Sequence, residues 1–194
     1  MKKLGFLMLL LTLAVMLGGT ALAQDSKNDQ YFTTYFSNAN TPGAPDATVR
    51  IINDGFTGTN IYAAIFVFDD SEELTECCDC EITPDSLLSE SVNNNLTANP
   101  LTGIKPTRGV IKVISSSEDS VQSGFGTPGL HAWATHVQKN SPVKTKTIQF
   151  DLTESPLADS NLTPSEQSLL YELCYFDGKL SGKPCTCTPE DQDF

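Results

Sequence analysis

Hydrophobic residues along most of this chain recur with the spacing of β-strands. The clearest strand is Ile61–Phe68, which is apolar at nearly every position and is therefore expected at the centre of a sheet covered on both faces. Ala47–Asn53 is a shorter apolar strand, and Arg108–Ser115 alternates in the manner of a half-buried strand. Leu130–Gln138 and Thr145–Leu152 follow, with Gly and Pro between them.

This arrangement predicts a mainly β protein, an antiparallel β-sandwich of immunoglobulin-like or jelly-roll-like type. The stretch from Leu87 to Leu101 is ambiguous. Leu88, Val92 and Leu96 have helical spacing, whereas the consecutive asparagines 93–95 favour extended or irregular chain. Neither internal repeats nor a linker between two domains is visible in the sequence.

One C-terminal helix is predicted over about residues 164–176. Thr163-Pro164-Ser165-Glu166 has the pattern of a capping box with proline at the first helical position. Gly178 is suited to end the helix in a left-handed conformation. The apolar face is expected to comprise Leu169, Leu170, Leu173 and Phe176.

The N-terminus has the pattern of a secretory signal peptide over residues 1–23. Lys2 and Lys3 precede the apolar run Leu4–Leu17, and Ala21-Leu22-Ala23 supplies a small-x-small cleavage site. Residues 24–194 are then expected to form a single sandwich domain with a polar tail at 188–194. An uncleaved anchor is the alternative, although the run is short for a membrane span, which needs about 20 apolar residues.

The charge balance bears on the class of partner. The chain has 24 Asp and Glu against 12 Lys and Arg, a net charge of −12. Loss of Lys2 and Lys3 with the signal peptide would make the balance more acidic still. Nucleic acids and anionic membranes are bound through Lys and Arg patches, so neither is expected as a partner. No membrane span is expected after signal cleavage.

Six cysteines form two clusters, and in an exported chain such clusters are first interpreted as disulfides. The disulfide candidates are Cys77, Cys78, Cys80, Cys174, Cys185 and Cys187. Neighbouring cysteines in extended chain point to opposite faces, so Cys77 and Cys78 are each expected to bond elsewhere. A bridge between the clusters closes a loop of about 100 residues, which the chain-entropy model values at about 4–5 kcal/mol.

A thiolate metal site and a redox-active pair remain alternatives for the same cysteines. The clusters hold enough sulfur for zinc or copper, and Glu76, Asp79 and Glu81 lie beside the first one. However, the Cys185-x-Cys187 spacing is not that of a structural zinc knuckle, and neither cluster has a neighbouring histidine. A redox pair would be expected in a lysine-rich setting that stabilises a thiolate, and the acidic residues beside the first cluster do not provide one. No cofactor is expected.

Other candidate chemistry is weak. His131 and His136 are the two histidines, and their offset of five places them on opposite faces of a strand. Trp133, on the face of His131, is expected in the core. The acidic run Asp69–Glu73 is interpreted as a solvated loop, with a calcium loop as the alternative. The sequence has no GxSxG elbow, and the SxxK match at Ser141–Lys144 lacks its companion motifs.

The block Cys77-Cys78-Asp79-Cys80-Glu81-Ile82-Thr83-Pro84, with the later Gly129–Trp133 and the Cys185-x-Cys187 ending, resembles a group of secreted bacterial proteins of unassigned function. The resemblance covers most of the mature chain. It implies an exported, cysteine-rich domain but no activity, cofactor or catalytic residue.

The sequence therefore predicts an exported, non-enzymatic structural or interaction protein of the bacterial envelope or extracellular space. An envelope protein or a second copy is the expected partner, with strand edges as the site of contact. The alternatives are an extracytoplasmic metal-binding protein that uses the cysteine clusters and, third, a polysaccharide-directed hydrolase, which would need two apposed carboxylates.

Overall fold

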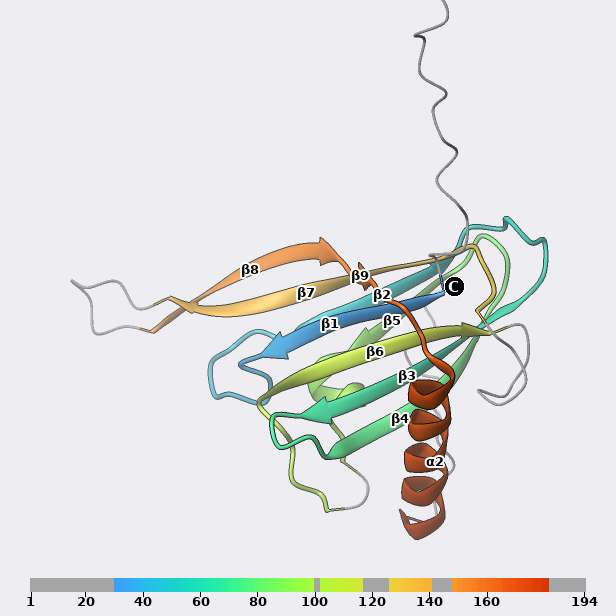
Figure 1. Cartoon of the computed structure of the whole chain (residues 1–194). Coiled ribbons are helices and arrows are strands. Elements are labelled where there is room, and N and C mark those ends of the chain that lie inside the picture. The colour runs from blue at the N-terminus through green and yellow to red at the C-terminus, as the bar shows by residue number, and fades with distance from the viewer. Residues whose placement is uncertain (1–29, 100–101, 117–125, 141–147, 182–194) are drawn as a thin grey trace, which may run out of the picture.

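Two antiparallel β-sheets pack face to face in this protein, and one helix lies on the outer face of the first sheet (Figure 1). The computed structural model describes residues 30–99, 102–116, 126–140 and 148–181. Sheet A has the strand order β4-β3-β6-β1-β9, and sheet B has the order β5-β2-β7-β8. The predicted fold class is thus confirmed. The elements are β1 (Tyr31–Ser37), β2 (Thr48–Asn53), β3 (Ile61–Asp69), β4 (Leu74–Ile82), β5 (Leu87–Ser91), the π-helix η1 (Val92–Leu96), β6 (Arg108–Ser116), β7 (Leu130–Asn140), β8 (Gln149–Pro156), β9 (Ala158–Asp159) and α2 (Pro164–Ser181).

The chain crosses between the sheets repeatedly, so that most strand pairs join segments distant in sequence. Within the described ranges, β3–β4 and β7–β8 are the pairs formed by consecutive strands. β1 pairs with β6, and β2 lies between β5 and β7. After β8 the chain leaves sheet B and adds β9 beside β1 at the far edge of sheet A.

β3 shows why sheet A must be covered on both faces. Alternate residues from Ile61 to Val67 point into the core between the sheets, and Ile61, Ile65 and Val67 are fully buried there. Phe66, on the opposite face, is 1% exposed and belongs to a second apolar cluster beneath α2. The sequence-based prediction of a central strand that is apolar on both faces is correct.

α2 packs on the outer face of sheet A, and its contacts are described for residues 164–174. Leu170 is fully buried in the cluster with Phe66 and Ile114, and Leu173 packs against the same cluster. Leu169, which we expected on the apolar face, is 49% exposed. It lies one position, or about 100°, round the helix from Leu170, which turns it towards solvent.

The N-terminus of α2 is fixed by polar contacts. Thr163 Oγ1 accepts a hydrogen bond from the backbone N–H of Glu166 at 3.2 Å, as the predicted cap requires. The Glu166 side chain points to the sheet instead of closing the capping box. Its carboxylate forms an ion pair with Lys112 and accepts a 3.4 Å hydrogen bond from Tyr31. Burial, followed by the charge and the hydrogen bond of Glu166, raises the pKa of Tyr31 to about 12.

The C-terminal end of α2 differs from the prediction. The helix continues to Ser181, so Gly178 lies inside it and does not end it. Glycine is tolerated within a helix at a cost of about 1 kcal/mol relative to alanine. Of the predicted apolar face, Phe176 falls among the residues whose side chains are not described.

The ambiguous stretch after residue 87 contains both kinds of structure. Leu88 lies in β5, whereas Val92 and Leu96 lie in the π-helix η1, and all three side chains are buried in the core. Ser91 caps η1 by accepting a hydrogen bond from the N–H of Asn94 at 3.0 Å. In the described part of the chain, no helix has the length and apolar character of a membrane span.

The contrast between two adjacent leucines tests the packing of α2. Replacing buried Leu170 with alanine is expected to lower the free energy of unfolding by about 2–5 kcal/mol, because it leaves a cavity beneath the helix. Leu169→Ala is the matched control and is expected to change it by no more than about 0.5 kcal/mol. Urea unfolding of both variants measures the difference. Equal losses would contradict this placement of the helix face.

Candidate functional site

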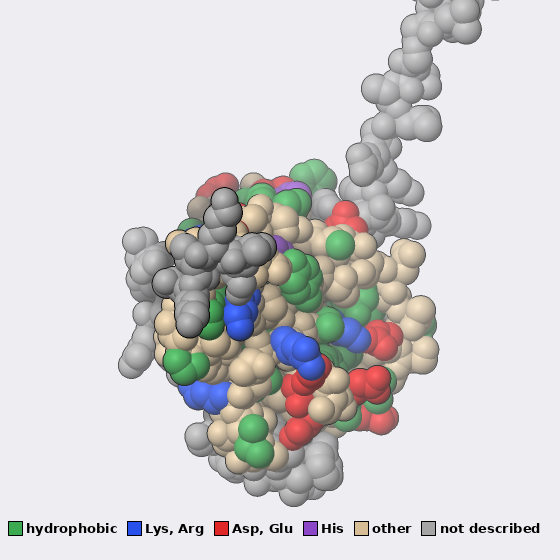
Figure 2. All heavy atoms as spheres, turned by 90° about the vertical axis from the view of Figure 1, so that its left-hand side faces the viewer, with side chains coloured by type: hydrophobic (Ala, Val, Ile, Leu, Met, Phe, Trp, Pro, Cys, Tyr) green, Lys and Arg blue, Asp and Glu red, His purple; other side chains and the backbone are tan. Residues whose placement is uncertain are grey.

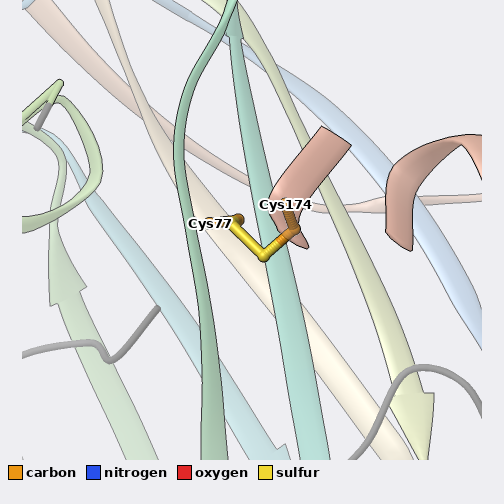
Figure 3. Close-up of a disulfide and its surroundings, with 2 residues drawn as sticks. All are labelled: Cys77 and Cys174. Carbon is orange, nitrogen blue, oxygen red and sulfur yellow. A yellow bond between two sulfur atoms is a disulfide. The ribbon is translucent and has the colours of Figure 1, made fainter. Parts of the chain in front are cut away.

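Three of the predicted cysteines lie on one edge strand. Cys77, Cys78 and Cys80 are in β4, where consecutive residues point to opposite faces. Cys77 faces α2 and forms a disulfide with Cys174, with a Cα–Cα distance of 5.8 Å and a sequence separation of 97 (Figure 3). The predicted covalent link between the middle of the chain and its C-terminal helix is therefore present.

Cys78 and Cys80 point to the other face, into the core between the sheets. Cys78 is also disulfide-bonded. Cys80 keeps a thiol, whose Sγ lies 3.9 Å from Oε1 of the buried Glu90 on β5. The remaining two candidates, Cys185 and Cys187, lie outside the described residues.

These bonds bear on the alternative of a thiolate metal site. Metal binding requires the deprotonated thiol, and a sulfur in a disulfide cannot supply it. Cys77, Cys78 and Cys174 are all disulfide-bonded, so they are not available as ligands in this state. Within the described ranges, no group of three or more His, Cys, Asp or Glu side chains is arranged to hold a metal ion. Asp69 forms part of the β3–β4 turn, where its carboxylate accepts hydrogen bonds from the N–H groups of Ser71 and Glu73.

The β7–β8 hairpin provides a second candidate site, an edge with exposed backbone groups. β8 is the last strand of sheet B, and in the described part of the chain it pairs only with β7 (Figure 1). Most of its side chains are exposed, including the hydrophobic Leu152 at 54%. A strand exposed in this way presents backbone donors and acceptors to another chain.

The hydrogen-bond pattern shows which backbone groups of β8 point away from β7. Leu157, directly after β8, donates its N–H to the carbonyl of Ala132 at 2.9 Å. In an antiparallel pair, bonded positions alternate with positions directed outward. Like Leu157, every second residue before it is therefore at a position bonded to β7, namely Ser155, Thr153 and Asp151. It follows that Phe150, Leu152 and Glu154 direct their N–H and C=O groups outward.

His136 anchors the inner face of the hairpin. Its ring stacks on Tyr35 of sheet A with 4.3 Å between centroids, and its Nε2 is 2.9 Å from Oγ of Ser155 on β8. The side chain is 5% exposed, and this burial lowers the pKa of His136, an effect that the backbone of Tyr35 partly offsets. His136 therefore favours its neutral form and joins the two sheets.

Sequence reasoning missed this contact between His136 and Ser155. The two residues are 19 positions apart, and their contact depends on the register of β7 and β8, which no local motif encodes. A serine beside a neutral histidine is one half of a nucleophile–base arrangement. However, no side chain of the described residues bonds to Nδ1 to orient the ring, so the catalytic arrangement is not complete.

His131 and Trp133 lie on the outer face of sheet B. His131 Nε2 is 3.1 Å from Asp54 Oδ2, and the ring of Trp133 is 6.5 Å from that of His131. The prediction that Trp133 belongs to the core is wrong: it is only partly buried, because the outer face of sheet B is not covered by a described helix. Beside it, Arg50 forms a 2.8 Å ion pair with Glu154 of β8. The surface seen in Figure 2 likewise interleaves acidic and basic side chains with exposed hydrophobic ones.

Comparison with known proteins adds little to this description. No family model and no curated protein matches the chain. Among solved structures, the chain is similar to the crystal structure of Thermotoga maritima 1070, with 12% sequence identity and a TM-score of 0.43. The match covers 69% of this chain and 96% of that chain. A likeness at this level carries no argument about function.

The buried His136 predicts a loss of stability in mild acid. Its pKa is lowered in the folded state from the ordinary 6.5, so the unfolded chain binds more protons once the pH falls below about 6.5. The free energy of unfolding should therefore decrease from pH 7.5 to pH 5.5. In His136→Gln this decrease should be smaller, as urea unfolding at each pH would measure. His131→Gln is the control for losing a partly exposed histidine, and an equal decrease in all three proteins would refute the assignment.

Proposed function

We propose that this chain is an exported, non-enzymatic interaction protein of the bacterial envelope or extracellular space, and that it associates through strand addition to β8. The observation that carries the proposal is the outward-directed backbone of Phe150, Leu152 and Glu154 on a sheet edge. The signal-peptide pattern of residues 1–23 and the two disulfide-bonded positions on β4 support the exported location.

Other sheet edges are less suited to adding a strand. β5 has five residues and runs directly into η1, and β9 has two. β4 has nine residues, but it is tied to α2 by the Cys77–Cys174 disulfide. β8 has eight residues, is mostly exposed, and has its proline, Pro156, at its last position. Pro156 is one of the positions whose backbone groups point away from β7. Its missing N–H therefore removes no hydrogen bond between β7 and β8.

The charges of β8 bear on the choice of partner. Asp151 accepts a 2.9 Å hydrogen bond from Asn140, and Glu154 pairs with Arg50, so both carboxylates have contacts within the protein. Charged residues on an edge strand discourage unselective pairing. A partner strand that carries Lys or Arg opposite these carboxylates would be favoured over an acidic one. The charges therefore favour an extended, basic segment of an envelope protein as the partner, and self-association is the alternative.

A proline in β8 tests strand addition directly. Because the N–H of Leu152 points outward, Leu152→Pro removes one intermolecular donor and leaves the hydrogen bonds to β7 intact. Leu152→Thr is the matched control, since it loses the same hydrophobic side chain but keeps the N–H. We expect the proline variant to bind at least about tenfold more weakly than the threonine variant, because the partner's acceptor loses its donor.

Two measurements read out this comparison: sedimentation equilibrium of the mature protein for self-association, and retention of envelope proteins on the immobilised protein. Leu152→Pro and Leu152→Thr are compared at equal concentration after urea unfolding has shown both to be folded. Equal association of the two variants would argue against β8 as the binding edge. A wild-type protein that stays monomeric at high concentration and retains no envelope protein would contradict the proposal as a whole.

A further inference from the structure

We infer that the edge of β4 is the docking surface for the protein's own C-terminal segment, residues 182–194, and that a disulfide from Cys78 to Cys185 or Cys187 holds the segment there. The inference is independent of the association proposed for β8. It rests on the bonding state of the β4 cysteines and on the distance that the chain can span after α2.

Two of the six cysteines are left as possible partners of Cys78. Cys78 is disulfide-bonded, whereas Cys77 is bonded to Cys174. Cys80 keeps its thiol, which is directed at Glu90. None of the other described cysteines is thus the partner of Cys78. The chain has two more, Cys185 and Cys187, and both follow α2 closely.

The chain after α2 is long enough to return to β4. The Cys77–Cys174 disulfide holds α2 with 5.8 Å between the two Cα atoms, and Cys78 is the next residue along β4. From Cys174 to Ser181 the helix rises about 10 Å. Four further residues span at most about 14 Å to Cys185, and six span about 21 Å to Cys187. Either cysteine can therefore return to the β4 edge.

β4 is an edge strand, and its cysteines point to both of its faces. Cys78 points into the space between the sheets, on the opposite side of β4 from α2. A segment that starts at the end of α2 must therefore pass round the strand to reach Cys78. β4 is the edge strand of sheet A, so no described strand of that sheet lies beyond it to block this path. The two bonds, one on each face of β4, would then fasten the segment over this edge.

Formation of the bond is an oxidation with a defined balance. The thiolate of one cysteine attacks a disulfide-carrying oxidant to give a mixed disulfide, and the second thiolate then displaces the reduced carrier. The two cysteines lose two protons and two electrons in total. The oxidant's disulfide is reduced to a dithiol.

Tryptic mapping of the oxidised full-length mature protein tests the inference. After alkylation in denaturant without reductant, trypsin releases 51–108 with the three β4 cysteines, 147–179 with Cys174, and 180–194 with both tail cysteines. We expect 51–108 to carry both other peptides. Further cleavage after Asp79 separates Cys78 from Cys80, and the tail peptide should stay with the fragment that contains Cys78.

Two variants sharpen the assignment. In Cys80→Ser, both peptides should remain attached to 51–108. In the Cys78→Ser/Cys80→Ser double variant, only 147–179 should remain. Attachment of 180–194 through Cys80, release of 180–194 from the wild-type protein, or a disulfide-linked dimer on a non-reducing gel would each overturn the inference. The mapping of the wild-type protein decides the question even if a variant fails to fold.

Discussion

The burial of both faces of sheet A is the constraint on which the rest of the structure depends. β3 carries large apolar side chains on each face, so neither face can be left in water without the loss of roughly 25 cal/mol for each Å² exposed. Sheet B covers one face, and α2 covers the part of the other face around Phe66 and Ile114. The Cys77–Cys174 disulfide and the contacts of Glu166 with Tyr31 and Lys112 reinforce the position of α2 on sheet A.

The two sheets consequently differ in what they offer to a partner. α2 covers part of the outer face of sheet A, whereas the outer face of sheet B carries the Arg50–Glu154 ion pair together with the partly buried Trp133 and the exposed Leu152. The exposed edge β8 belongs to this second sheet. A covalently reinforced sheet thus packs against a more open one, whose exposed edge is the strand to which we propose that a partner adds.

Sequence patterns located the elements whose hydrophobicity is local and continuous. The predicted strands at Ala47–Asn53, Ile61–Phe68, Arg108–Ser115 and Leu130–Gln138 correspond to β2, β3, β6 and β7. β4 was not predicted, because the run from Thr75 to Glu81 is interrupted by acidic residues. Its alternation becomes visible only when the cysteines are counted as buried apolar side chains. β1 and β5 were also missed.

The candidate site was predictable in part. Because adjacent residues in extended chain point to opposite faces, the separate partners of Cys77 and Cys78 could be anticipated from their positions alone. The sequence could not show that Cys80 faces Glu90 or that His136 contacts Ser155, since both contacts join strands whose pairing depends on the whole fold. Nor could the sequence show that β8 is an edge strand, because the order of strands in a sheet is a property of the whole fold.

The amino-acid sequence by itself determined the β character, the C-terminal helix and the choice of cysteines as cross-links. Periodicity, capping residues and thiol chemistry are properties of short segments. The tertiary structure decided which strands are edges, which faces are covered and which side chains meet. Those outcomes depend on register and on the order of strands in each sheet, and these are set by the simultaneous burial of residues far apart in the chain.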